Sequence, residues 1–140
     1  MTDIKTYLIK YDENDRPYIS DNFKVSKEQW IDMFNDNIFT GKAMDMLEKW
    51  YNSESHQSTV PAMCVKNGID IKKQPYNGLL SGMAKKIRKT LDIELIGKNN
   101  NEHSNWILLY ESWKVNKHWM LKQREELVQA IEELELFSKV

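Results

Sequence analysis

The order of patterns in residues 56–110 restricts the fold more than any other part of the chain. A short apolar helix is predicted after Ser58, and Gly68 ends it at a position where a left-handed backbone suits glycine. A connection of about seven residues leads to a longer helix over residues 76–90. Two strands then follow, 93–96 and 105–110, joined by a polar loop. Helix, turn, helix and hairpin in this order are typical of a winged helix-turn-helix, with the hairpin as the wing.

The flanking segments predict further elements of one domain. Residues 1–24 read as an N-terminal arm or hairpin, and residues 25–140 as a single winged-helix-like domain. Ser26 and Gln29 have the spacing of a capping box at the start of a helix. We also expect a helix from Thr40 to about Asn52, an undecided stretch over 113–119 and a final helix over 121–137. The predicted class is α+β, mostly helical, with a winged helix-turn-helix core, a β-hairpin wing and a C-terminal helix.

The overall composition favours a small folded domain. The chain has 140 residues with 41% hydrophobic and 29% charged residues, enough to form a core without crosslinks. No apolar run approaches the roughly 20 residues that span a bilayer, and residues 1–10 lack the apolar centre of a signal peptide. Cys64 is the single cysteine, so no internal disulfide forms and we expect a cytoplasmic location.

Charge is unevenly distributed along the chain. The net charge is −1, but residues 66–98 carry eight basic and three acidic side chains, a net charge of +5. Residues 1–65 carry a net −4, and residues 99–140 a net −2. A basic stripe of this kind suits contacts with nucleic acid phosphates. A solvated helix face is the alternative interpretation, and the charge alone does not choose between them.

The basic helix and the loop after it contain the candidate DNA contacts. Cations near the helix end would neutralise phosphates, and polar residues near its start would contact bases or backbone, although cations there also complement the helix dipole. Gly78 and Gly82 lie four residues apart, a spacing that suits close packing against a neighbour. The candidate DNA-binding residues are Tyr76, Asn77, Ser81, Lys85, Lys86, Arg88, Lys89 and Lys98.

No pattern in the sequence predicts catalysis. His56, His103 and His118 lack the spacing of a metal site, and Cys64 has no inferable partner base. No phosphate-binding glycine loop or nucleophile elbow occurs. We therefore expect no enzyme activity, metal or cofactor. Two tryptophans beside two lysines suit core packing, cation–π pairing or base stacking, namely Trp113, Trp119, Lys114 and Lys117.

A series of short motifs covers residues 25–133. In chain order these are Ser26-Lys27-Glu28-Gln29-Trp30, His56-Gln57-Ser58-Thr59, Met63-Cys64, Gly68, Tyr76-Asn77-Gly78-Leu79, Met83-Ala84-Lys85-Lys86-Ile87, Trp106, Trp119, Glu126-Leu127 and Ala130-Ile131. Their order resembles the N-terminal module of modification-dependent restriction proteins, the McrB-like AAA+ GTPases and HNH nucleases. The spacing from Trp119 to Glu126-Leu127 is longer than in that family, and no nuclease or AAA+ domain is present. The resemblance implies an isolated recognition or accessory module.

Two functions from different classes follow from these observations. The first is a non-catalytic module that binds double-stranded DNA and is related to restriction systems and host–phage defence. The second is a protein-interaction module, such as a phage or mobile-element inhibitor of a host defence nuclease. The basic stripe motivates the first function, and the small size with acidic terminal regions motivates the second.

Overall fold

The structure is a computed structural model that describes residues 4–68, 76–97 and 106–137, with the backbone alone for Tyr76 and Asn77. Its α-helices are α1 (Lys27–Asn35), α2 (Lys42–Tyr51), α3 (Val60–Lys66), α4 (Tyr76–Leu91) and α5 (Glu125–Glu133). Its strands are β1 (Lys5–Tyr11), β2 (Pro17–Ile19), β3 (Gln57–Ser58), β4 (Ile93–Ile96), β5 (Tyr110–Val115) and β6 (His118–Gln123). Short 3₁₀ turns follow β2 and precede β3, at Ser20–Asn22 and Glu54–His56. The predicted α+β class is confirmed.

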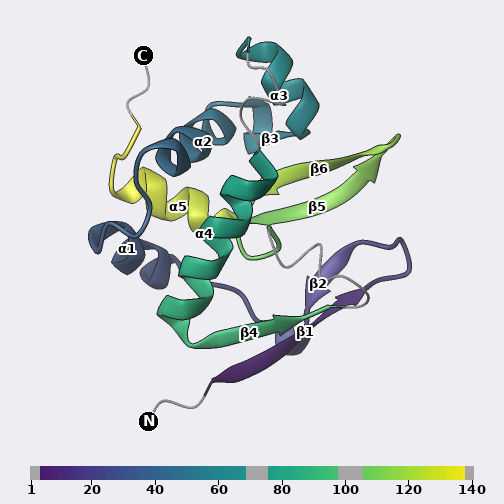
Figure 1. The fold of residues 1–140 in the computed structure, drawn as a ribbon, viewed down its shortest axis with the longest axis vertical. Helices are drawn as coiled ribbons and strands as arrows, with labels where there is room; N and C mark the ends of the chain where they lie inside the picture. The colour runs from purple at the N-terminus through teal and green to yellow at the C-terminus, as the bar shows by residue number, and fades with distance from the viewer. Residues whose placement is uncertain (1–3, 69–75, 98–105, 138–140) are drawn as a thin grey trace.

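Two three-stranded sheets form the β part of the fold (Figure 1). The first has the strand order β2-β1-β4, in which β1 pairs antiparallel with β2 and parallel with β4. The second has the order β3-β6-β5 and is antiparallel throughout. In Figure 1 the helices gather on one side of the hairpin β5–β6, and β1 and β4 lie below it. The N-terminal hairpin is thus joined to the rest of the chain through β4.

The helices start and end at local sequence signals. Ser26 and Gln29 form the predicted capping box of α1, with each side chain bonded to the other residue's backbone N–H. Thr59 caps α3 by accepting from the N–H of Ala62, and Gly68 follows this helix with a φ of +63°. Gly41, rather than Thr40, occupies the N-cap of α2. The core draws side chains from every helix and from both sheets, among them Ile9, Trp30, Trp50, Met63, Leu80, Tyr110 and Leu127.

The predicted hairpin between 93–96 and 105–110 is wrong. The strand at 93–96 exists as β4, but its partner is β1, with Leu8 opposite Ile96. Residues 106–109 form a turn, because the N–H groups of Leu109 and Tyr110 both donate to the Trp106 carbonyl. These four residues are buried on all sides, so their apolar run reflects burial and not a strand.

Residues 113–119, for which the sequence predicts no definite structure, lie in a different hairpin. This hairpin also contains the first residues of the predicted final helix. β5 and β6 pair in a continuous register from Tyr110–Gln123 to Val115–His118. The predicted helix over 121–137 therefore begins only at Glu125 and ends at Glu133. Arg124 separates strand from helix, and its Nε–H donates to the Ile107 carbonyl at 2.8 Å. In the described residues no helix is long and apolar enough to cross a bilayer.

Candidate nucleic-acid interface

Helix α4 exposes one face that is free of acidic side chains. Its buried positions follow the helical repeat and include Leu80, Met83 and Ile87. On the opposite side, residues 78, 82, 85, 86 and 89 are exposed. Their spacing along the sequence places them on a single stripe of the helix. We call this stripe the α4 face: Gly78, Gly82, Lys85, Lys86 and Lys89.

The two glycines of the α4 face have no packing role among the described residues. No heavy atom lies within 4 Å of the position that a Cβ would take on Gly78 or Gly82. A glycine inside a helix costs about 1 kcal/mol relative to alanine. Close packing against the described residues, for which their spacing is suited, is therefore absent. The N-terminal half of the α4 face is flat, and its C-terminal half carries three lysines.

The remaining predicted contacts divide into three groups. Ser81 is half-buried beside the α4 face. Arg88 is also half-buried; burial lowers the pKa of its guanidinium, and the nearby Glu94 carboxylate acts in the opposite direction. Tyr76 and Asn77 form the first turn of α4, with side chains outside the described residues, and Lys98 lies outside them altogether. The structure thus brings Lys85, Lys86 and Lys89 together on one exposed surface.

The turn between β5 and β6 adds a second basic segment, whose Lys114 and Lys117 the sequence marks beside two tryptophans but does not place among the candidate DNA contacts. Asn116 and Lys117 form a two-residue loop, and Asn116 has a φ of +57°. Tight hairpin loops need a positive φ at this first position, and asparagine tolerates it better than most residues. An asparagine between two runs of strand formers was the signal for this turn. Lys114, Asn116, Lys117 and His118 are all exposed around it.

The two tryptophans of this hairpin each contact a cation. Lys114 lies opposite Trp119 in the strand register, and its Nζ is 5.7 Å from the centroid of the Trp119 ring. The guanidinium carbon of Arg16, from the loop between β1 and β2, lies 5.4 Å from the Trp113 ring centroid. Both distances are those of cation–π pairs. Of the roles that the sequence left open, cation–π pairing is present for Lys114 with Trp119. Core packing is also present, because Trp119 packs against the core and its ring centroid lies 6.4 Å from that of Trp106.

The described residues contain no arrangement typical of a metal site. No group of three or more His, Cys, Asp or Glu side chains among them is placed to hold an ion. His56 stacks on Tyr51, and its Nδ1 lies 2.6 Å from the Tyr51 carbonyl oxygen, so it has a structural partner. Cys64 is buried in the core, and His103 lies outside the described residues.

A comparison of the sequence with protein-family models finds no match, and comparisons with curated proteins and with solved structures also find none.

Proposed function

We propose that this chain is a DNA-binding domain of the winged-helix type, with α4 as the recognition helix and the Asn116–Lys117 turn as the wing. The chain order of helix, short strand, helix, helix and hairpin supports this proposal, as does the strand order β3-β6-β5. In a winged helix the short first strand likewise joins the edge of the hairpin. The wing is then formed by β5 and β6, with β4 as an added strand that pairs elsewhere.

The observation that carries the DNA proposal is the charge of the α4 face. Three exposed lysines stand together on a helix that contains no acidic residue. Duplex DNA presents phosphates on both sides of the major groove, and a helix in the groove meets them along its flanks. The flat glycine half of α4 would let the helix backbone approach the DNA closely. Lys117, at the end of the hairpin, would reach a further phosphate.

The decisive experiment compares two double variants with the same net charge. Lys85→Glu with Lys86→Glu changes the α4 face, and Lys5→Glu with Lys42→Glu changes exposed lysines on β1 and α2. We expect fluorescence anisotropy with a random duplex at about 50 mM salt to show at least a tenfold loss of affinity for the first variant alone. Equal losses in both would show that binding is a general effect of charge and would overturn the assignment to α4.

The resemblance to restriction proteins adds an expectation about the DNA. Those proteins are modification-dependent, so we propose that the domain binds a duplex with modified bases more tightly than the unmodified duplex. The same anisotropy assay with the two duplexes tests this point. Equal affinities would show that binding does not depend on DNA modification. The DNA-binding proposal itself would remain.

A protein-interaction module is the second candidate function. Its specific support is a row of exposed apolar side chains on the sheet β2-β1-β4, which lies outside the α4 face. Contiguous apolar surface on a small domain commonly marks a protein contact.

A further inference from the structure

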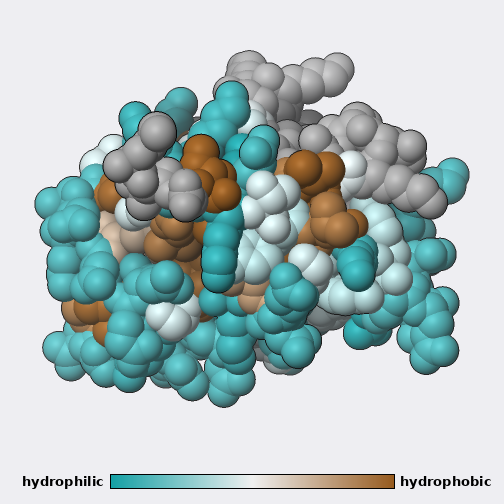
Figure 2. Space-filling model, turned by 90° about the horizontal axis from the view of Figure 1, so that it is seen from below, coloured by the Kyte–Doolittle hydropathy of each residue, from teal (hydrophilic) through white to brown (hydrophobic). Residues whose placement is uncertain are grey.

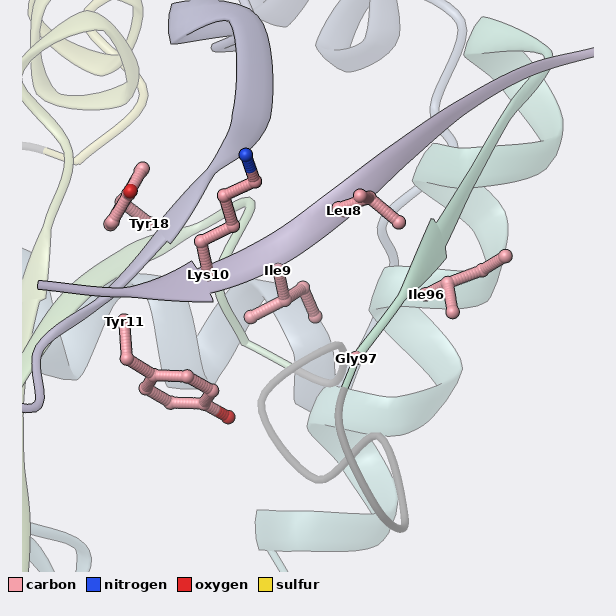
Figure 3. Close-up of a pocket in the computed structure, with 7 residues that line it drawn as sticks. All are labelled: Leu8, Ile9, Lys10, Tyr11, Tyr18, Ile96 and Gly97. Carbon is pink, nitrogen blue, oxygen red and sulfur yellow. The ribbon is translucent and has the colours of Figure 1, made fainter.

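The sheet β2-β1-β4 covers the core with one face only. Ile9, Ile93 and Leu95 point inward and are 5%, 8% and 5% exposed. Successive side chains of a strand alternate between faces, so Leu8, Lys10 and Tyr18 share the opposite face with Ile96. Figure 3 shows Lys10 and Tyr18 projecting to one side of the sheet and Ile9 and Tyr11 to the other. We call the side that carries Leu8, Lys10, Tyr18, Glu94 and Ile96 the outer face.

The outer face has an apolar centre. Leu8 and Ile96 are directly paired across β1 and β4, and each is 46% exposed. Tyr18 on β2 is 45% exposed, and Ile4 before β1 is 63% exposed. A shallow cavity of about 550 Å³ opens beside them at the end of β4. Figure 2, viewed from below Figure 1, shows brown apolar side chains reaching the surface between hydrophilic ones. Apolar residues gathered on adjacent strands, unlike single ones, indicate an interaction surface.

The charges on the outer face are arranged symmetrically about this centre. In the strand register Thr6 lies opposite Glu94, Leu8 opposite Ile96, and Lys10 opposite Tyr18. Glu94 is therefore two residues from Ile96, and Lys10 is two residues from Leu8. The two charged residues lie roughly 7 Å from the Leu8–Ile96 pair, in opposite directions along the strands. An acidic group thus stands at one end of the apolar centre and a basic group at the other.

We propose that the outer face binds a second copy of this chain. The two copies would stack their outer faces on each other, related by a two-fold axis that lies between the sheets and crosses the strands at the level of Leu8 and Ile96. This axis makes the strands of the two copies run in opposite directions. The apolar centres then meet, and Lys10 of each copy faces Glu94 of the other. The two residues lie on neighbouring strands about 4.8 Å apart sideways, within reach of a lysine side chain. The pattern is self-complementary, as a two-fold dimer requires. A uniformly charged partner would match only one end.

The size of the surface sets the strength of this dimer. A few half-exposed apolar side chains per copy place the contact among small interfaces, which form weak and transient complexes. We expect a dissociation constant of about 10⁻⁵ to 10⁻³ M.

Charge exchange between copies tests the proposal. Sedimentation velocity from about 10 μM to 2 mM should show a reversible dimer of the wild type, whereas Lys10→Glu and Glu94→Lys should each be monomeric, because like charges then face each other. An equimolar mixture of the two variants restores both ion pairs and should dimerise again. Lys5→Glu, on the same strand but outside the outer face, should dimerise like the wild type.

Three results would overturn the proposal: a wild type that stays monomeric throughout, single variants that dimerise normally, or a mixture that stays monomeric. If circular dichroism shows that Glu94→Lys is unfolded, Leu8→Glu replaces it. Leu8 is exposed in the monomer, so this variant should fold and should lose the dimer; retention of the dimer would contradict the proposed surface. All these positions lie outside α4, so the result is independent of DNA binding.

Discussion

Replacement of Gly82 by alanine should make the protein more stable. Gly82 lies near the middle of α4 with a helical backbone, and a Cβ at this position meets no atom of the described residues within 4 Å. Alanine would therefore lower the conformational entropy of the unfolded chain without introducing a clash. The gain in the free energy of unfolding should be about 1 kcal/mol.

The corresponding shift in melting temperature follows from the chain length. Unfolding entropy is about 2.1 cal/mol/K per residue, which gives roughly 290 cal/mol/K for a chain of this size. A gain of about 1 kcal/mol then raises the melting temperature by about 3 °C. Differential scanning calorimetry resolves a change of this size.

Gly41 provides the matched control for the same chemical change. It has a φ of +56° and a ψ of −122°, a conformation that alanine adopts only under strain, and a Cβ there also meets nothing within 4 Å. Gly41→Ala should therefore lower stability by about 1–3 kcal/mol through the backbone alone. A lower melting temperature for Gly82→Ala would refute the claim that the α4 face is open.

The DNA proposal also predicts that Gly82→Leu keeps the stability but loses affinity for DNA, because the leucine blocks the close approach of the helix.

Three further predictions concern the interior and the helix ends. Ser26→Ala removes the acceptor of the capping box and should cost about 1 kcal/mol of unfolding free energy in urea titrations, while Ser26→Thr should retain most of it. Gln123 is 2% exposed and its Oε1 has no hydrogen-bond partner among the described residues, so Gln123→Glu should bury an unpaired carboxylate and cost at least about 3 kcal/mol at pH 7. That loss should shrink toward pH 4 as the carboxyl group becomes protonated; a loss independent of pH would contradict the reasoning. Lys27 donates to Glu133, whose hydrogen bond and charge raise the pKa of Lys27 above 10.5. The pair should stabilise the wild type relative to Glu133→Gln below pH 10.5, and the difference should disappear as the pH rises through the raised pKa.

Local elements of the fold could be predicted from the sequence because their signals lie within a few residues of each other. The capping box of α1 needs only Ser26 and Gln29, and the end of α3 needs only Gly68. The helical repeat of α4 likewise separates its buried side from the exposed lysines. For this reason the positions of α1 to α4 and the exposure of three candidate contacts on the α4 face could be predicted without the structure, whereas α5 begins four residues after its predicted start.

The pairing of β4 could not be predicted, because its partner strand lies far away in the chain. The alternation of β4 fixes which side chains point inward but does not identify the neighbouring strand. Its partner β1 precedes it by more than 80 residues, with α1 to α4 in between. The buried run before β5 also had the composition of a strand, so the hairpin was predicted over 93–96 and 105–110, and Lys117 was not placed at a hairpin turn.

The salt dependence of binding to duplex DNA tests the central claim most directly. If Lys85, Lys86, Lys89 and Lys117 each neutralise one phosphate, the logarithm of the association constant should fall with the logarithm of salt concentration with a slope of about −3.6. Lys117→Glu should reduce the magnitude of this slope by about 0.9 and leave the fold unchanged. Absence of binding at about 20 mM salt, or a slope near zero, would contradict the account.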